Sequence, residues 1–133
     1  MRKKNPWFAK TMLSISLMCF VSVSLAKVNN QDDTKPRKDG IASYYSDKFH
    51  GRTTSSGESY DKNDLTAAHN TLPLGSVLLV TNLSNNQSVV VRVNDRLNKS
   101  NKRLLDVSKQ AAKQLGFIRS GHTKVKIEIL GTV

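Results

Sequence analysis

The sequence predicts one mainly β domain, closed into a small barrel with one or two short helices, and three observations support this fold class. The chain has 133 residues, which is the length of a single domain. Several short runs rich in β-branched residues, together with one helical pattern, fill roughly its last ninety residues. The chain has one cysteine, so an apolar core must hold the fold together without an intramolecular disulfide.

The N-terminal segment has the pattern of a secretory signal peptide. Residues 1–26 contain four basic residues and no acidic one, an apolar stretch runs from 12 to 25, and Ala26 is a small residue suited to cleavage. The stretch is short for a membrane-spanning helix, although an uncleaved N-terminal anchor is the alternative. Met18 stands before Cys19, where a bacterial lipobox has a small residue, so lipidation is not expected.

The remaining chain divides into a polar leader and a globular part. Residues 27–39 have no apolar side chain after Val28 and are expected to form a flexible leader, so the folded domain covers 40–133. Without the four basic residues of the signal, 17 Lys and Arg stand against 10 Asp and Glu, a formal charge of +7. This charge predicts an anionic extracytoplasmic partner, such as wall glycan, teichoic polymer or lipid headgroups, in preference to nucleic acid.

Strand signals follow one another along the globular part. Four strands are expected, at 41–45, 77–80, 89–93 and 124–129, and a brief apolar segment lies at 65–68. Asn85-Asn86 separates the second strand from the third, and asparagine tolerates the positive φ of a tight turn, so these two strands should form an antiparallel hairpin. In the last strand Val125, Ile127 and Ile129 alternate with charged residues, as in a strand with one buried face.

The connections carry the remaining local signals. Residues 46–64 are rich in Gly, Ser, Thr and charge and are predicted to form a long loop, and a turn is predicted at 72–75, where proline and glycine stand together. A single short helix is expected between Ser108, a suitable N-cap, and Gly116, a suitable C-terminal residue.

Polar residues at the ends of the apolar segments are the candidates for chemistry. Asp95 follows the run at 89–93, His69 ends the segment at 65–68, and Glu58 lies in the long loop. A partly desolvated carboxyl at a barrel rim can have a raised pKa and act as acid and base. The alternative for Asp95 is a turn residue that caps its own backbone. Arg96 and Asp106 are equally compatible with a structural ion pair.

No metal site or cofactor is expected from the motifs. The sequence has no phosphate-binding glycine loop and no paired-cysteine or paired-histidine zinc motif. A zinc site from His50, His69 and Glu58 is imaginable, but their separation does not follow the usual ligand spacing.

Over residues 40–130 the sequence resembles the rare lipoprotein A (RlpA) family of septal-ring lytic transglycosylases. The matching segments, in the family's order and spacing, are GIASYY (40–45), FHGRTT (49–54), GESYD (57–61), LTAAHNTLPLG (65–75), VTNL (80–83), VRVNDR (91–96) and LDVSKQAA (105–112). The resemblance implies a double-psi β-barrel of about six strands, related to expansin and barwin domains. It also implies cleavage of peptidoglycan glycan strands, preferably strands stripped of stem peptides.

The resemblance assigns roles to individual residues. The catalytic aspartate corresponds to Asp95, and the supporting acidic residue and histidine correspond to Glu58 and His69. Glu58 would position substrate or raise the pKa of Asp95 by like charge, and His69 would hydrogen-bond Asp95 or the sugar. The residues expected to bind substrate are Tyr44, Tyr45, His50, Thr54, Tyr60, Asn94 and Arg96. For the three tyrosines, packing in the core or at the rim is the alternative.

The sequence departs from the family pattern beside these residues. Leu97-Asn98 follows Arg96 where the family has Gly-Pro, and Ser55-Ser56 stands where the family has Ala-Asn. The first change favours an alternative function, an expansin-like barrel that binds wall glycan without cutting it. A hydrolase using Glu58 and Asp95 together is the other alternative.

The resemblance also sets expectations for the protein's surroundings. The partners are peptidoglycan glycan strands and possible contacts with the cell-division machinery, with no stable membrane anchor and no nucleic acid. The protein is expected to be an exported monomer, periplasmic or secreted after cleavage near Ala26.

Overall fold

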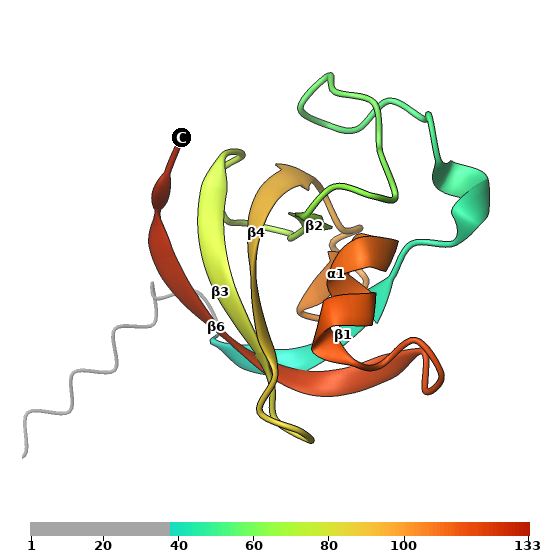
Figure 1. Cartoon of the computed structure of the whole chain (residues 1–133). Helices are drawn as coiled ribbons and strands as arrows, with labels where there is room; N and C mark the ends of the chain where they lie inside the picture. Colours follow the sequence, from blue (N-terminus) through green and yellow to red (C-terminus); the bar gives the residue numbers. More distant parts are fainter. Residues whose placement is uncertain (1–37) are drawn as a thin grey trace, which may run out of the picture. The chain divides into compact units, whose positions relative to one another are not determined.

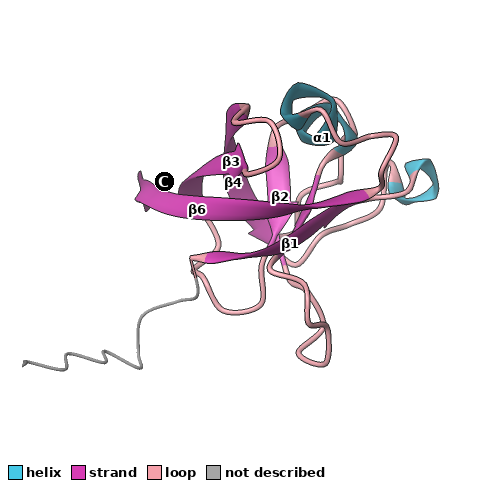
Figure 2. Cartoon of the chain, turned by 90° about the horizontal axis from the view of Figure 1, so that it is seen from below, coloured by secondary structure: helices cyan, strands magenta, loops and turns pink. Residues whose placement is uncertain are grey.

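The computed structural model describes residues 38–133, so the predicted signal peptide and all but the last two residues of the predicted leader lie outside the described residues. Six strands form a closed barrel, and Figures 1 and 2 show them with the helix packed against one side. The elements in chain order are β1 (Asp39–Tyr44), the 3-10 helix η1 (Asp47–Phe49), β2 (Thr66–Ala68), β3 (Ser76–Asn82), β4 (Ser88–Asp95), β5 (Leu105–Val107), α1 (Lys109–Leu115) and β6 (His122–Thr132).

The longest strand, β6, closes the barrel by pairing with β3 on one side and β1 on the other. The strand order is β1-β5-β2-β4-β3-β6, with β6 antiparallel to both β3 and β1. The pairs β1–β5 and β2–β4 are parallel, so each joins strands that are separated by a crossover connection. The predicted hairpin of β3 and β4 is confirmed, with Val80 opposite Val89 and Asn86 at a φ of 60° in its turn.

The core is built by period-two alternation along these strands. Leu78 and Val80 of β3, Val91 of β4 and Val125 of β6 are at most 1% exposed. The helix adds Ala111, Ala112 and Leu115, which are fully buried. Each large aliphatic side chain buried in this way contributes about 1.5–3 kcal/mol, so the barrel needs no disulfide. Within 38–133 no helix is long and apolar enough to cross a membrane.

The strands differ from the sequence prediction in four places. Neither β2, which lies in the brief apolar segment, nor β5 was expected as a strand, because three residues carry too little periodicity to predict one. β1 begins at Asp39, and the carbonyl of Lys38 already accepts a hydrogen bond from the N–H of Ile127, so the barrel begins before Gly40. Ile129 does not lie on the buried face as expected: it pairs with Leu78 where the register shifts, and it is 50% exposed.

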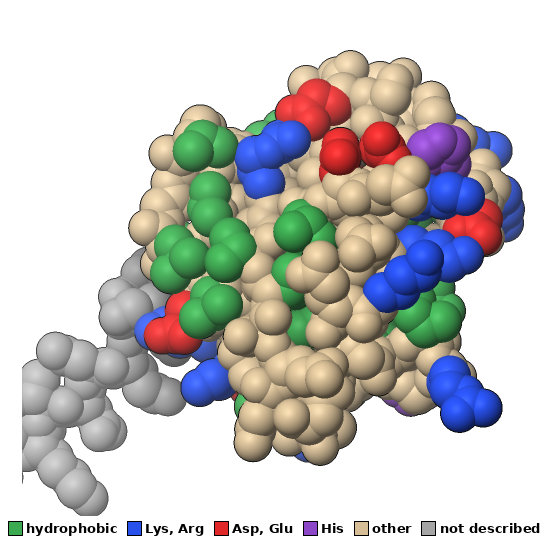
Figure 3. Space-filling view, in the orientation of Figure 1, with side chains coloured by type: hydrophobic (Ala, Val, Ile, Leu, Met, Phe, Trp, Pro, Cys, Tyr) green, Lys and Arg blue, Asp and Glu red, His purple; other side chains and the backbone are tan. Residues whose placement is uncertain are grey.

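Apolar side chains gather on the outer surface of β3, β4 and β6, as the space-filling view shows (Figure 3). Val90, Ile129 and Leu130 are 44%, 50% and 58% exposed. Val90 lies opposite Leu79 in the β3–β4 pair, so apolar residues are neighbours across this face.

The helix α1 has the predicted boundaries. The Ser108 hydroxyl accepts a hydrogen bond from the N–H of Ala111 and donates one to the carbonyl of Asp64. Gly116 ends the helix with a φ of 76°, a left-handed conformation that glycine adopts without strain. Through these two hydrogen bonds the fully buried Ser108 connects the start of the helix to the end of the long loop.

Replacing Ser108 with alanine should lower the free energy of unfolding by about 1–2 kcal/mol, because the change removes an N-cap and leaves the Asp64 carbonyl without its donor. Urea denaturation measures the change. Ser59→Ala is the control, since Ser59 is exposed and its side chain makes no hydrogen bond among the described residues. Equal stability of the two variants would contradict the capping role.

Candidate active site

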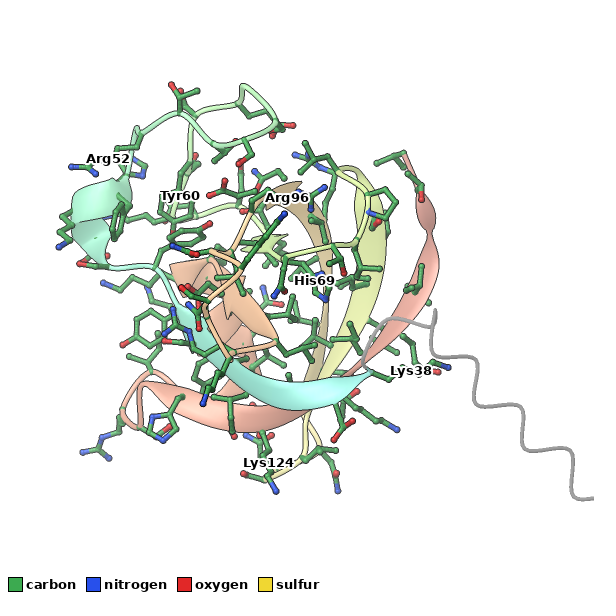
Figure 4. All side chains as sticks on the ribbon, turned by 180° about the vertical axis from the view of Figure 1, so that it is seen from behind. Lys38, Arg52, Tyr60, His69, Arg96 and Lys124 are labelled. Carbon is green, nitrogen blue, oxygen red and sulfur yellow. The ribbon has the colours of Figure 1, made fainter. Side chains whose placement is uncertain are left out.

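The site forms where two parallel strands end at the same edge of the barrel. Asp95 is the last residue of β4, and Ala68, the last residue of β2, lies opposite it. The N–H of His69 donates to the carbonyl of Asp95 at 3.2 Å. The fold therefore places side by side two predicted residues that are far apart in sequence. Figure 4 shows Tyr60, Arg96 and His69 around this edge, beside the long loop.

The carboxylate of Asp95 accepts four hydrogen bonds. The Tyr45 hydroxyl donates to Oδ2 at 2.6 Å. The N–H and the hydroxyl of Ser55 donate to Oδ1 at 2.9 and 2.8 Å, and the N–H of Arg96 donates to the same oxygen at 2.8 Å. Only the bond from the N–H of Arg96 is local, as expected if Asp95 were merely a turn residue that caps its own backbone. The other three come from segments far away in the sequence.

These donors hold Asp95 in its ionised form. Burial is the largest single influence and raises the pKa, but the bonds from Tyr45, Ser55 and Arg96 together outweigh it and place the pKa below its usual range. The expectation of a raised pKa is therefore wrong for the free protein. The pKa of the Tyr45 hydroxyl moves in the opposite direction: burial and the bond to Asp95 both raise it.

Glu58 does not act on Asp95 through like charge, because an arginine neutralises it. Arg92 Nη1 and Nη2 donate to the two oxygens of Glu58, each at 2.7 Å. The bonds from Arg92 lower the pKa of Glu58. Desolvation raises it by a smaller amount, and the amide of Asn94, 3.5 Å away, lowers it further. The carboxylate of Glu58 is thus an ion-paired structural group on the barrel's outer surface.

The ion pair anchors the loop that carries Ser55. Thr53 and Ser59 form an isolated antiparallel bridge, and we call residues 53–59 the 53–59 hairpin. The N–H of Ser56 donates to the carbonyl of Asn94 at 3.0 Å, so this hairpin is attached to β4 at a second point. Glu58 therefore positions Ser55 over Asp95.

His69 is buried and neutral. Its Nδ1 accepts hydrogen bonds from the N–H groups of Thr71 and Leu72 at 3.1 and 3.0 Å, so the ring proton lies on Nε2. Burial, and then the charge of Arg96, lower the pKa of His69. Among residues 38–133 Nε2 is buried without a hydrogen-bond partner, and the expected side-chain bond from His69 to Asp95 is not present.

Arg96 has a structural partner different from the one suggested by sequence. Its Nη1 donates to the carbonyls of His69 and Leu72, which fixes the turn after β2. The suggested pair of Arg96 with Asp106 is wrong, because Arg103 binds both oxygens of Asp106 at 2.7 Å.

A pocket of about 240 Å³ opens beside the Asp95 carboxylate, and we call it the Asp95 pocket. Its lining residues are Tyr45, Phe49, Arg52, Thr53, Thr54, Tyr60 and Asp95. The rings of Tyr45 and Tyr60 lie 4.5 Å apart, and the guanidinium of Arg52 lies 5.2 Å from the ring of Phe49. Aromatic and hydroxyl groups next to a carboxylate suit the binding of a sugar ring.

Four of the seven predicted substrate-binding residues do not line this pocket: Arg96, whose backbone partners are given above, Tyr44, His50 and Asn94. The Tyr44 hydroxyl donates to the carbonyl of Ile118 and its ring packs edge-on against Phe117, so Tyr44 supports the core. His50 is exposed and its Nδ1 accepts from the N–H of Lys62. Asn94 is 3% exposed beneath Glu58.

The residues that the structure describes offer no metal centre. No group of three His, Cys, Asp or Glu side chains in 38–133 is arranged to hold an ion. The imagined zinc ligands have separate partners: Lys62 for His50, a backbone turn for His69 and Arg92 for Glu58.

Sequence reasoning missed two residues that hold the site together, and it also missed three lining residues of the Asp95 pocket, Phe49, Arg52 and Thr53. Arg92 interrupts the apolar run at 89–93, and a charged residue inside such a strand is a signal of an outer-face partner. Ser55 was noticed only as a departure from the family pattern, and nothing in the sequence indicated that it donates hydrogen bonds to Asp95.

Comparison with known structures agrees with this fold. The chain is similar in structure to the crystal structure of an expansin from Clavibacter michiganensis, with a TM-score of 0.57, 21% identity, and coverage of 71% of this chain and 50% of that one. It is similar to cerato-platanin 3 from M. perniciosa with a TM-score of 0.53 and 13% identity, over 70% of this chain and 94% of that one. The predicted double-psi β-barrel is thereby confirmed.

Sequence comparison then gives the family. Residues 37–127 match the lytic transglycolase family. The endolytic peptidoglycan transglycosylase RlpA of Campylobacter jejuni is 55% identical over 93 residues, and that of Neisseria meningitidis serogroup A is 56% identical over 89 residues. These matches cover 70% and 67% of this chain but 34% and 37% of the relatives. The chain belongs to the lytic transglycolase family and spans about a third of the length of these curated relatives.

Tyr45→Phe should raise the pKa of Asp95, because it removes the donor to Oδ2, and Ser55→Ala should raise it by a smaller amount. NMR titration of the Asp95 carboxyl carbon measures both shifts. Ser56→Ala is the matched control, since the Ser56 hydroxyl contacts Thr54 and not Asp95. An unchanged titration midpoint in both variants would show that these hydroxyls do not hold the carboxylate.

Glu58→Gln should lower stability at pH 7 by less than about 1 kcal/mol, because the pair with Arg92 is solvent-exposed. The folded-state pKa of Glu58 is lowered, so its contribution is complete above the unfolded value of about 4.3 and disappears as the pH falls through the folded value. Urea denaturation of the variant and wild type should show a smaller difference at pH 3 than at pH 7. Glu128→Gln is the control, and a difference that does not shrink between pH 7 and pH 3 would contradict the ion-pair account.

Proposed function

We propose that this protein is an endolytic lytic transglycosylase that cleaves peptidoglycan glycan strands, preferably those without stem peptides. The observation that carries the proposal is the Asp95 carboxylate at the side of an aromatic pocket, at the position that corresponds to the family's catalytic aspartate. Membership of the lytic transglycolase family and the names of the relatives support the same activity.

The proposed reaction breaks one bond and forms one bond without water. The C6 hydroxyl oxygen of a muramic acid residue attacks C1 of the same sugar, and the C1–O bond to the next sugar breaks. The attacking hydroxyl loses its proton and the leaving oxygen gains one, so atoms and charge balance. The products are a 1,6-anhydro-muramic acid end and a free hydroxyl on the released strand.

Asp95 is the proposed group that transfers this proton. It is ionised in the free protein, so it can accept a proton from the C6 hydroxyl and return a proton to the leaving oxygen. To act first as an acid it must gain a proton when substrate binds. A sugar that covers the carboxylate would strengthen burial, the influence that already raises its pKa.

The surrounding residues are proposed to position the reacting groups. Glu58 holds the 53–59 hairpin through Arg92, and this ion pair disfavours a hydrolase that would need Glu58 as a free second carboxyl. Tyr45, Thr54 and Tyr60 contact the sugar in the Asp95 pocket. The backbone of His69, fixed by Arg96, supports the strand end that carries Asp95.

A glycan-binding barrel without catalysis is the second candidate. The observation that favours it is that both Asp95 oxygens are already occupied by hydrogen bonds. The structural likeness to an expansin concerns the fold alone and is compatible with either candidate.

The proposed substrate also places the protein outside the cytoplasm. Peptidoglycan lies there, and the N-terminal 26 residues have the composition of a secretory signal. We propose a periplasmic or secreted protein that acts as a monomer, and recruitment by the cell-division machinery is part of the same proposal.

Mass spectrometry of products from peptide-free glycan strands tests the activity. Wild type should release fragments with 1,6-anhydro ends, and Asp95→Asn should reduce their rate of formation at least about a hundredfold, as expected for the loss of an acid–base group. Fragments that have gained water would identify a hydrolase instead. Strands that stay intact but are retained by the protein would identify a non-catalytic glycan binder.

A further inference from the structure

A second cavity lies next to the catalytic strand end and plays no part in the function proposed above. It has a volume of about 320 Å³ and is lined by His69, Asn70 and Thr71 after β2 and by Asn101, Lys102 and Arg103 before β5. It shares no lining residue with the Asp95 pocket. His69 joins the two, because it lines this cavity and its N–H is bonded to the carbonyl of Asp95.

The lining of this cavity carries positive charge and several hydrogen-bond donors. Lys102 is exposed and forms no ion pair within the described residues. Arg103 uses Nε and Nη2 to bind Asp106, which leaves Nη1 without a hydrogen-bond partner among the described residues. The Nε2–H of His69 is a buried donor that has no acceptor in the described part of the chain. No carboxylate from residues 38–133 lines the cavity, so its chemistry suits a ligand with anionic oxygen atoms.

The loop that carries Lys102 is held at both ends by buried leucines and has hydrogen bonds of its own. Leu97 and Leu104 are 8% and 4% exposed and anchor it to the barrel. Within it, the carbonyl of Asn98 accepts from the N–H of Asn101 at 2.8 Å, and the side-chain oxygen of Asn101 accepts from the N–H of Arg103 at 3.0 Å. Lys102 is therefore held between two ordered residues at the cavity wall.

All charged residues of this loop are basic. Residues 96–103 contain Arg96, Lys99, Lys102 and Arg103 and no acidic residue. A glycan strand that passes Asp95 would meet this segment on the side of His69. In a peptide-free strand each muramic acid carries a lactyl carboxylate, whereas a stem peptide converts that group into an uncharged amide.

We propose that this cavity, the basic cavity, binds the lactyl carboxylate of a muramic acid residue next to the bond at Asp95. Lys102 supplies the charge, and the neighbouring amide and guanidinium groups supply hydrogen bonds. This inference rests on the proposed function. It gives a physical reason for a preference for peptide-free strands, because only those strands present the carboxylate.

Kinetics on two chemically matched substrates test the basic cavity. The substrates are peptide-free glycan strands and the same strands with their lactyl carboxyls reduced to alcohols. Wild type should show a KM about three- to tenfold lower for the native strands, with similar kcat, as expected for one partly exposed charge contact. Lys102→Met should raise the KM for native strands to the value for reduced strands and leave kcat unchanged.

Lys99→Met is the matched control, because Lys99 lies on the same loop, is exposed and does not line the cavity. It should discriminate between the two strands as wild type does. Equal KM values of wild type for both strands, or full discrimination by Lys102→Met, would overturn the proposal.

A binding measurement separates this inference from the activity itself. If wild type cleaves neither strand, the proposed function fails, but dissociation constants for the Asp95→Asn protein still test the cavity. Tighter binding of native than of reduced strands, lost in the variant that also carries Lys102→Met, would support the basic cavity. Equal binding of the two strands would reject it.

Discussion

The carboxylate of Asp95 and its hydrogen-bond donors are the interaction on which the site depends. Tyr45 directly follows β1, Ser55 lies in the 53–59 hairpin and Arg96 directly follows β4, and all three donate to this one side chain. A buried charge is costly unless it is paired or hydrogen-bonded, so the carboxylate both requires these donors and draws their segments together. The ion pair of Glu58 with Arg92 secures the hairpin from the outside.

The barrel topology makes this convergence possible. β2 lies parallel to β4, and β1 lies parallel to β5, so strands that are distant in sequence end at neighbouring positions. The long loop between β1 and β2 returns across the end of β4, where it forms the wall of the Asp95 pocket. The same arrangement creates a requirement for the proposed catalysis: a bound sugar has to raise the pKa of Asp95 against donors that stabilise the ionised carboxylate.

Local periodicity was enough to predict the hairpin of β3 and β4, the helix from Ser108 to Gly116 and most of β6. It could not predict β5, whose three residues are held by pairing with β1 and β2. The resemblance identified Asp95, Glu58 and His69, but the sequence could not reveal their partners. Whether a side chain such as Tyr44 packs against Phe117 or faces a sugar depends on tertiary contacts, which leave no pattern in the sequence.

A crystal structure of the Asp95→Asn protein with a peptide-free tetrasaccharide of peptidoglycan tests the central claim most directly. The account predicts a sugar in the pocket lined by Tyr45 and Tyr60, with a muramic acid glycosidic oxygen within about 3.2 Å of the side chain at position 95. A tetrasaccharide bound to another face, such as the apolar surface of β3, β4 and β6, would contradict the assignment of Asp95 as the acid–base group.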